Sequence, residues 1–564
     1  MKDHGRPRTI RVGNGPEFIY VIPIILVLCS FTLFSSHLFY HDDSYITLRY
    51  AQRLLDGKGL TWNDGERVEG FTSFLWLIQN AFLGYTGIDL ESGSRYLGLA
   101  YYLAILLILI LSKVPTLCLI PLMTLPSLNI YAMSGMETVS FCFWILAGTI
   151  LLTREIERDK TKTSIRPNEI IRNLSSGKTC VASGLLFAAG GLTRPEGVLV
   201  GILVLSYLFA AKMVPRAILF LLGFIPPVFG YQLFRVLYFH DFLPNTYYAK
   251  SAHVAKAILL KSTALSLAKW SYEWTPIAIL ILLVLRRESI KKYILPLIVA
   301  FPIFMAYFAG GGDHFTGIRI ILPAIVVLGY AAGHRLEARL ISLGRGVFTV
   351  AVMVSLYQLF LSTVLWQRPI FPLTFGLKPR EEAACLGQIE GRFLEKNLPP
   401  GTLVAINPAG ALPYFAPSLS FIDMLGLNDR IIAKRDIRTL TTVFQRKPGH
   451  FKGDGAYVIS RRPDAIILGP HPGILKRDDG RLFLSDYEIL RDVRFQRLYY
   501  PYQLDIPITD QQKEEWEWYA LRRFLESGHY SLTLWLRKDS DKVDSLRNIG
   551  AKIDIPPFEI PPLK

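Results

Sequence analysis

Long apolar runs recur along the first two thirds of the chain and then stop. Most have about 15 to 23 residues, which matches the roughly 30 Å hydrocarbon core of a bilayer when a run is helical. No comparable run occurs between Phe371 and Lys564. The pattern predicts a polytopic α-helical membrane domain over residues 1–367, followed by a second domain over residues 368–564. The predicted transmembrane helices, about eleven in number, lie near residues 18–40, 96–112, 114–131, 137–152, 179–193, 196–211, 217–238, 275–285, 293–309, 320–333 and 347–366.

The segment from Phe71 to Tyr85 is apolar but carries Gln79 and Asn80, so it either spans the membrane or lies in its interface. The charges of the loops decide between these. If the segment lies flat, the main basic loops share the side of the basic N-terminus, as the positive-inside rule requires. We therefore predict an interfacial helix here. The basic segments that this choice places inside are Lys113, 153–178, Lys212 with Arg216, 286–292 and 335–345.

With this topology the polar motifs all lie on the outer face, together with the C-terminal region. The motifs occupy residues 41–70, 134–138, 193–197, 240–250 and 310–319. Their charged side chains are the carboxylates of Asp42, Asp43, Glu69, Glu137, Glu196 and Asp313 and the cations of Arg194, Lys250 and Arg319. Cations at this depth suit a phosphate carried on a lipid. Simpler interpretations stay open: Glu137 caps a helix, Arg194 snorkels, and residues 310–312 form a turn.

Asp42 and Asp43 follow the first apolar run directly, where the chain first meets water. Carboxylates beside a bilayer cost free energy and are usually kept for function. Two interpretations remain open: the pair belongs to a catalytic site, or it caps the amphipathic helix expected over residues 44–55. Asp42, which directly follows His41 at the end of the span, is the better placed of the two for chemistry on a lipid. The run before them has no small-residue cleavage site, which indicates a retained span.

Residues 240–250 read HDFLPNTYYAK and concentrate polar groups after a proline. Asn245, Tyr247, Tyr248 and Lys250 supply an amide, two phenols and an ammonium group within six positions. Sugars and phosphates are commonly bound by such groups. We therefore assign this segment to binding of a phosphorylated sugar.

Asp313 and His314 form an Asp-His pair within GGGDHFTGIR. Together with Asp43 they offer oxygen ligands and one imidazole, a set that suits a divalent ion such as Mg²⁺ or Mn²⁺. Such pairs also occur without a metal, so ligation and a purely local role both stay open.

Composition and charge agree with a membrane protein that carries a polar domain. Hydrophobic residues make up 51% of the chain and charged residues 19%. The formal net charge is +16, but lysine and arginine collect in cytoplasmic loops of multispan proteins, so this charge does not indicate a nucleic-acid partner. Four of the five cysteines lie in apolar segments, and no disulfide framework is readable.

The C-terminal region alternates short apolar strands with helical segments, which predicts an α/β domain. Strands are expected over residues 403–407, 421–424, 464–468 and 532–536, and helices over residues 381–396, 409–416 and 511–527. GxGxxG is absent, so we expect acceptor binding here rather than a nucleotide site. Within FIDMLGLND, Asp423, Asn428 and Asp429 either bind a glycan or close a turn. Residues 499–502 offer aromatic faces or belong to the core.

These motifs resemble those of GT-C-fold glycosyltransferases, membrane enzymes that take a sugar from a polyprenyl phosphate on the outer face of the cytoplasmic membrane. The likeness is to the bacterial terminal arabinofuranosyltransferase family. It rests on HDDSYITLRYAQRLLDGKGLTWNDGERVEGFTSFLW, SGMET, TRPEG, LPNTYYAK, GGDHFTGIRIILPA and FIDMLGLND, which cover most of the chain in order. The resemblance implies a GT-C-like membrane domain and a periplasm-facing catalytic carboxylate at Asp42 or Asp43.

The expected function is transfer of a sugar, such as arabinofuranose or another pentose, from a polyprenyl-phosphate donor to a cell-envelope glycan acceptor. The protein would lie in the bacterial cytoplasmic membrane, with its active site and C-terminal domain in the periplasm. Two alternatives from other classes are a flippase for lipid-linked glycans and a non-catalytic glycan-binding membrane protein. Transporters place charges near the midplane of repeated, broken helices, whereas these charges lie at span ends.

Overall fold

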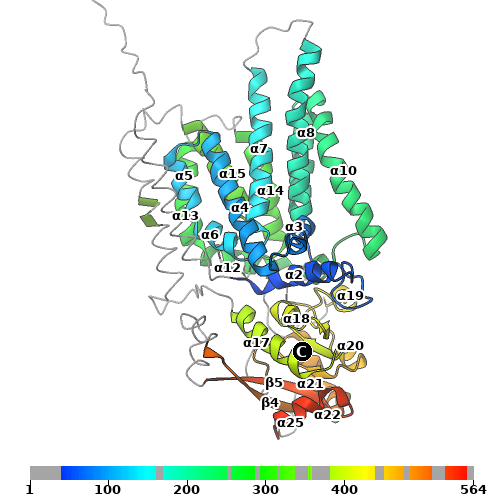
Figure 1. The fold of residues 1–564 in the computed structure, drawn as a ribbon. Helices are drawn as coiled ribbons and strands as arrows, with labels where there is room; N and C mark the ends of the chain where they lie inside the picture. The colour runs from blue at the N-terminus through cyan, green and yellow to red at the C-terminus, as the bar shows by residue number, and fades with distance from the viewer. Residues whose placement is uncertain are drawn as a thin grey trace, which may run out of the picture.

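The computed structural model describes residues 40–160, 169–250, 256–285, 293–313, 315, 317–336, 353–354, 356–357, 382–437, 450–474, 482–510 and 528–554. These residues form a helical bundle and a C-terminal domain with a sheet, which lies against one end of the bundle (Figure 1). The predicted span at 18–40 lies outside the described residues except for Tyr40, and most of the span at 347–366 lies outside them too. The predicted boundary near residue 368 is also outside.

The bundle is built from apolar helices. The elements up to the end of the bundle are α2 (Asp42–Leu55), α3 (Phe74–Tyr85), α4 (Leu90–Leu111), α5 (Thr116–Met123), α6 (Pro126–Met133), α7 (Thr138–Lys160), α8 (Glu169–Thr193), α9 (Pro195–Ala210), α10 (Val214–Phe239), α11 (Asn245–Lys250), α12 (Lys256–Lys269), α13 (Ser271–Leu285), α14 (Ile294–Ala309) and α15 (Leu322–Leu336). Helices α4 and α10 and residues Thr138–Arg158 of α7 are long and apolar enough to cross a membrane, and α9, α14 and Leu322–Gly333 are shorter apolar helices. The protein is therefore a multi-pass membrane protein, and the number of crossings stays a prediction.

The segment predicted as one span at 114–131 forms two short helices, α5 and α6, instead of one continuous helix, and its crossing of the membrane stays a prediction. The chain breaks at Thr124 and Leu125, and Pro126 begins α6. Proline has no N–H to continue a helix and disfavours helical geometry in the residue before it. Helix α12 was not predicted.

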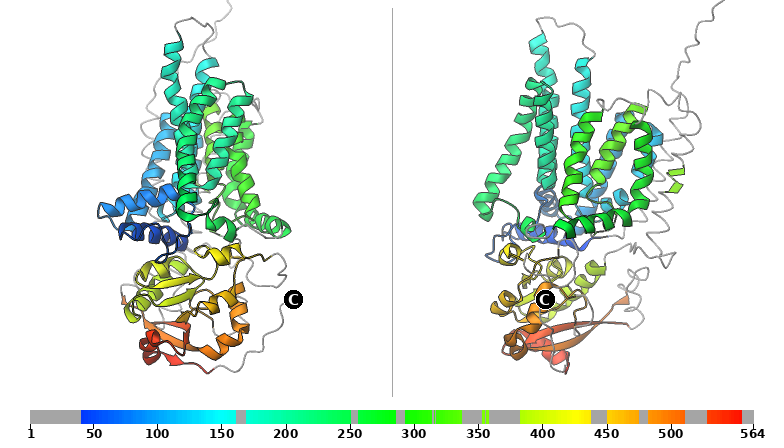
Figure 2. Two further views of the ribbon diagram at one scale, coloured as in Figure 1. Left: turned by 90° about the vertical axis from the view of Figure 1, so that its right-hand side faces the viewer. Right: turned by 180° about the vertical axis from the view of Figure 1, so that it is seen from behind.

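Three helices lie across the end of the bundle instead of along it. Figures 1 and 2 show α2, α3 and α12 in this crosswise layer, between the upright helices and the C-terminal domain. Helix α3 corresponds to the segment 71–85 and has the crosswise orientation that an interfacial helix requires. Its Phe82 and Tyr85 side chains are exposed, as amphipathic aromatic residues often are at a membrane surface.

The C-terminal domain confirms the predicted mixture of strands and helices. Its sheet has the order β2-β1-β3-β5-β4-β6, in which β1 pairs in parallel with β2 and β3 and the other pairs are antiparallel. The strands are β1 (Leu403–Ile406), β2 (Ser420–Asp423), β3 (Ala465–Ile466), β4 (Tyr499–Pro507), β5 (His529–Arg537) and β6 (Ala551–Lys552). The helices are α17 (Glu382–Asn397), α18 (Ala411–Phe415), α19 (Arg430–Lys434), α20 (Gly455–Ser460), α21 (Leu484–Arg491), α22 (Val493–Leu498) and α25 (Asp544–Ile549).

Strand β4 was missed by the sequence analysis, which left residues 499–502 as either an aromatic surface or core. Both alternatives apply, because side chains on a strand alternate between faces. Tyr499 is buried, whereas Tyr500 is 40% exposed. The predicted helix at 511–527 lies outside the described residues.

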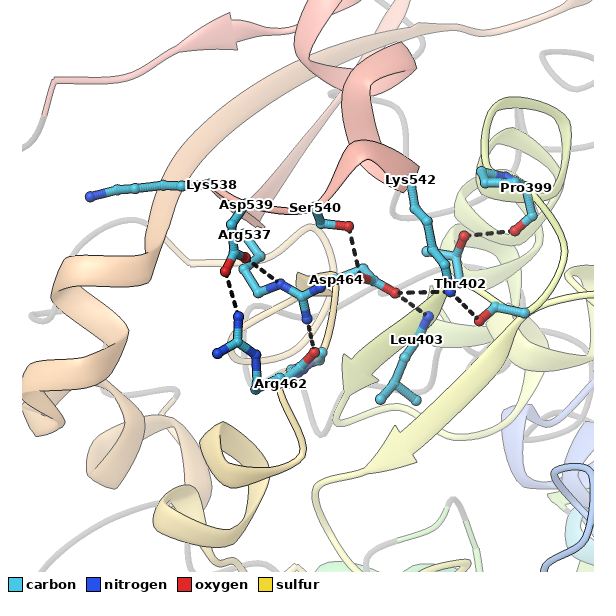
Figure 3. A network of polar contacts seen from close by, with 12 residues as sticks. Pro399, Thr402, Leu403, Arg462, Asp464, Arg537, Lys538, Asp539, Ser540 and Lys542 are labelled. Atoms are coloured by element: carbon cyan, nitrogen blue, oxygen red, sulfur yellow. Dashed lines mark hydrogen bonds and ion pairs between the residues drawn. The ribbon is translucent and has the colours of Figure 1, made fainter.

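A carboxylate next to the start of β3 connects the neighbouring strands (Figure 3). Asp464 accepts hydrogen bonds from the N–H of Leu403 at 2.9 Å, the Arg537 guanidinium at 2.9 Å and the Ser540 hydroxyl at 2.8 Å. These partners come from β1, from β5 and from the segment after β5. The network therefore fixes the order of the central strands.

The two parts of the protein meet through a clamp that α2 makes on α18. The Asp42 carboxylate accepts a hydrogen bond from the N–H of Ala411, the first residue of α18, at 2.8 Å. At the other end of α18, the Arg49 guanidinium donates to the carbonyls of Pro413 and Leu419. Gly410 is required here, because a Cβ at this position would lie 2.1 Å from the Asp42 carbonyl.

A continuous hydrophobic core surrounds this clamp. It joins Tyr45 and Trp62 of residues 41–70, which we call the first loop and which include α2, to Leu412 and Phe421 of the C-terminal domain. Asn63 adds a paired contact: its amide donates to the Phe421 carbonyl at 2.7 Å and accepts from the Phe421 N–H at 3.0 Å. The first loop therefore folds as part of the C-terminal domain's core.

We expect Arg49→Ala to lower the free energy of unfolding by about 3 to 5 kcal/mol, because buried carbonyls lose a charged donor. Arg49→Lys should recover only part of the lost stability, since one ammonium group cannot reach both the Pro413 and the Leu419 carbonyls. Thermal unfolding of the purified protein measures the effect.

The matched control is Arg461→Ala, which removes another arginine that bonds between the C-terminal domain and the rest of the protein. Arg461 pairs with Glu66 at 3.2 Å, but both side chains are more than a third exposed, so its loss should cost about 0 to 1 kcal/mol. Equal losses for the two variants would contradict the importance of the clamp.

Candidate functional site

The N-cap of helix α2 is His41. This differs from the alternative interpretation in which Asp42 and Asp43 cap the helix. The His41 ring accepts the N–H of Asp43 at 3.3 Å through Nδ1, and the backbone N–H of His41 donates to the Ser134 carbonyl at 3.1 Å. Ser44 donates to the same carbonyl at 2.8 Å. The start of α2 is thus attached to the end of α6 in the bundle, and both aspartates lie in its first turn.

Asp42 and Asp43 have different surroundings. Asp42 is buried and bonded to Ala411, so its carboxylate faces the C-terminal domain. This differs from the expectation that Asp42 is the better placed for chemistry. The reason is geometric: neighbouring residues on an α-helix point about 100° apart, so only one of two adjacent carboxylates faces a given partner.

Asp43 is half-buried, and no side chain in the described part of the chain donates a hydrogen bond to its carboxylate. Burial by itself raises the pKa of Asp43, but the charges of Lys250, His41, Arg319 and His450 outweigh burial and hold the pKa below its usual range. The carboxylate is therefore ionised at neutral pH and has free lone pairs.

The basic side chains around Asp43 come from separate parts of the chain. Lys250 ends α11, Arg319 precedes α15, and His450 belongs to the C-terminal domain. Phe315 contacts two of the groups: the His41 ring lies edge-on to it at 4.0 Å between centroids, and the Arg319 guanidinium lies 4.0 Å from its centroid. Sequence analysis missed His450, which follows no local motif.

Two of the three predicted phosphate-binding cations already have carboxylate partners. Arg194 pairs with Glu137 at 2.7 Å and with Glu196 at 2.9 Å. Arg319 pairs with Asp313 at 3.0 Å. For Lys250, the only interaction that the described residues provide is its attraction to Asp43.

Other predicted binding residues hold the fold together. Glu69 accepts from Tyr231 at 2.6 Å and pairs with Arg235 of α10 at 2.6 Å. The Asn245 amide donates to three carbonyls of the C-terminal domain, those of Gly426, Leu427 and Asp429, at 2.9 to 3.2 Å.

The two tyrosines of α11 differ in their surroundings. The Tyr248 hydroxyl donates to Asp241 at 3.1 Å, and Tyr247 is 48% exposed at the surface. These contacts do not establish a role for either phenol in sugar binding, which stays a prediction.

The FIDMLGLND segment closes a turn. Asp423 accepts the N–H groups of Leu425, Gly426 and Asn428. Burial raises the pKa of Asp423 to about 6. Asp429 caps α19 by accepting from Ile431 and Ile432. This bears out the turn alternative for Asp423.

The metal hypothesis stays a prediction. Asp313 bonds to Arg319 and to the N–H of Phe315, and His314 lies outside the described residues. Among the residues that the structure describes, no group of three or more potential ligands of the His, Cys, Asp or Glu type lies together.

Comparison with known proteins supports the resemblance noted from the motifs. A family described as a domain of unknown function (DUF8728) matches residues 381–519. The terminal β-(1→2)-arabinofuranosyltransferase of Corynebacterium glutamicum is 29% identical over 269 residues, which cover 44% of this chain and 39% of that protein. The enzyme of the same name from Mycobacterium tuberculosis is 31% identical over 232 residues, or 37% of this chain and 35% of that protein. The matches thus span less than half of these relatives.

One solved structure similar to this chain is that of ArnT from Cupriavidus metallidurans in the apo state. It aligns with a TM-score of 0.47 at 13% sequence identity, over 75% of this chain and 89% of that chain.

We expect Asn245→Asp to lower the free energy of unfolding by about 3 kcal/mol or more, because it puts an unpaired carboxylate against three carbonyl oxygens. Thermal unfolding and proteolysis of the C-terminal domain report the loss. Tyr247→Phe, two positions away and half-exposed, is the control and should change stability by at most about 0.5 kcal/mol. An Asn245→Asp variant as stable as the wild type would contradict the contacts.

Proposed function

We propose that this protein is a GT-C-type glycosyltransferase that uses a polyprenyl-phosphate sugar donor. The observation that carries the proposal is the Asp43 carboxylate, which is ionised, half-buried, without a hydrogen-bond donor among the described residues and stabilised by the charges of Lys250 and Arg319. It occurs in a chain that is similar, over 44% and 37% of its length, to two terminal β-(1→2)-arabinofuranosyltransferases. The sugar is arabinofuranose or another pentose, and the acceptor is a cell-envelope glycan.

In the proposed reaction Asp43 is the general base. Its carboxylate takes the proton from an acceptor hydroxyl while that oxygen forms a bond to the anomeric carbon of the donor sugar. The bond from that carbon to the phosphate oxygen breaks, and the polyprenyl phosphate leaves with an added negative charge. Lys250, whose charge acts on Asp43, stabilises the departing phosphate.

Arg194 and Arg319 act less directly. Each is held by carboxylates, so they supply positive potential from fixed positions, and the loss of their partners would be costly. A divalent ion, Mg²⁺ or Mn²⁺, bound by Asp43, Asp313 and His314, would add Lewis-acid stabilisation of the phosphate. Removing divalent ions with a chelator tests this part separately.

The C-terminal domain is proposed to hold the acceptor. It contributes His450 to the surroundings of Asp43 and is held against the bundle by α2, so it borders the reacting groups. The proposed location is the bacterial cytoplasmic membrane, with the site and this domain in the periplasm. This follows from the distribution of basic loops.

The test is transfer of label from a radioactive polyprenyl-phosphate sugar to a glycan acceptor by the purified full-length protein. We expect product with the wild type and a loss of turnover of roughly 10²-fold to 10⁴-fold in Asp43→Asn, which removes the proton acceptor but keeps the size. A flippase or a glycan-binding protein would form no product.

The matched control is Asp42→Asn, since an Asn oxygen can still accept the Ala411 N–H. This variant should keep most of the wild-type turnover. Asp42→Ala should lower the stability of the protein, because the Ala411 N–H loses its acceptor. Full activity in a folded Asp43→Asn variant would exclude Asp43 as the base.

The pH dependence gives a further prediction. Removing a cation raises the pKa of a neighbouring carboxylate, so Lys250→Gln should move the acidic limb of the kcat/KM profile to higher pH. Its KM for the lipid donor should also rise, because a contact made in the ground state is lost. Lys434→Gln removes an equal charge whose contacts are with Asp241 and the Tyr248 ring, so it is the control and should leave the limb unchanged. If the wild type and both variants have the same pH profile, Lys250 does not belong to the active site.

A further inference from the structure

Exposed apolar side chains continue from the membrane-facing surface of α10 onto the C-terminal domain. On α10, Phe229, Leu233 and Leu237 are exposed at intervals of four residues and form one stripe along the helix. Such a stripe on a spanning helix faces lipid. Beyond the end of α10, Phe242 is 68% exposed and Tyr247 48% exposed.

The next exposed residue in this series belongs to the other domain. Ile431 of α19 is 55% exposed. Its neighbour Arg430 donates to the carbonyl of Phe239, the last residue of α10, and to the carbonyl of Arg67. This bond fixes the first turn of α19 at the level where the spanning helix ends, and Figure 1 shows α19 beside that end of the bundle.

The polar side chains at this place are mostly cationic. Arg430 and Lys434 are each more than a third exposed, and Arg67 is exposed as well. Asp241 is the acidic partner of Arg430 and Lys434 and is largely buried, so it offsets only part of their charge. Aromatic and aliphatic side chains mixed with lysine and arginine are typical of surfaces that enter the headgroup layer of a bilayer.

We propose that Phe242, Tyr247, Ile431, Arg430 and Lys434 form a membrane-surface patch through which the C-terminal domain binds the headgroup layer beside the bundle. The occupant is an anionic phospholipid surface, since apolar side chains enter the acyl boundary while the cations contact phosphates. The patch continues a surface that already faces lipid. It does not depend on the enzymatic activity proposed above.

The patch gives the C-terminal domain a second attachment. The clamp on α18 fixes the domain to the first loop, and the patch sets its angle to the membrane plane through α19. Asn245 links α11 to α19, because it starts α11 and donates to the carbonyls just before α19. Movement of the domain away from the bilayer would therefore require these contacts to break.

The experiment places a bimane fluorophore at Ile431→Cys in the full-length protein, reconstituted into nanodiscs that contain brominated phospholipids. Ile549→Cys is the matched control: it has the same residue type and is 57% exposed, but lies on α25 at the far side of the domain (Figure 1). Labelled wild type gives the background from the native cysteines.

We expect quenching at position 431 to exceed that at position 549 at least twofold. Equal quenching at the two positions would overturn the proposal. Shielding of the 431 label that grows with protein concentration, without lipid quenching, would assign the surface to a second copy and would also overturn it.

The charges are tested with phosphatidylglycerol and phosphatidylcholine nanodiscs. Quenching at position 431 should be stronger in phosphatidylglycerol, and adding Lys434→Gln should reduce the difference. The same quenching in both lipids would refute the part of the proposal that assigns the cations to anionic headgroups.

Discussion

The clamp of α2 on α18 is the interaction on which the arrangement of this protein depends. Two opposite charges, seven positions apart on α2, hold the two ends of one short helix: Asp42 binds the N–H at its start, and Arg49 binds carbonyls at and beyond its end. The negative Asp42 lies at the positive, N-terminal end of the α18 dipole, and the positive Arg49 lies at its negative, C-terminal end. Both side chains are buried, so losing either contact would leave a buried charge or buried carbonyls without hydrogen-bond partners, at a cost of several kcal/mol. The C-terminal domain therefore has one orientation on the first loop.

The same geometry gives the neighbouring carboxylates of Asp42 and Asp43 different roles. The start of α2 is held to the bundle through His41, Ser44 and the Ser134 carbonyl. With the helix fixed at both ends, Asp42 faces the domain and Asp43 faces the cations. A structural role for the first carboxylate is thus what gives the second a defined position while leaving its oxygens open. The principle is that a reactive group is held by its backbone and not by bonds to its own functional atoms.

Fixed charges in the membrane part follow a similar rule. Arg194 and Arg319 lie beside carboxylates that neutralise them, which makes these cations tolerable where apolar helices surround them. Lys250 is partly exposed at the end of a short helix, and the described residues leave its ammonium without a hydrogen-bond acceptor. The cations thus differ in availability although they carry the same formal charge.

The sequence by itself determined the features that depend on nearby residues. Apolar runs such as 96–112 and 217–238 correspond to helices α4 and α10, because length and hydrophobicity are local properties. The strands at 403–407 and 421–424 appear as β1 and β2, and even the break before Pro126 had a local signal.

Only the tertiary structure determined which side chains form hydrogen bonds with which distant parts of the chain. Asp42 and Ala411 are 369 positions apart, and Asn245 reaches carbonyls more than 180 positions away. Strand β4 exists through its long antiparallel pairing with β5, and its prolines obscured it in the sequence. Residue types indicated that carboxylates, amides and cations gather on one face. Whether each would be bonded or left open depended on contacts that close long loops, and the sequence of one segment carries no information about those.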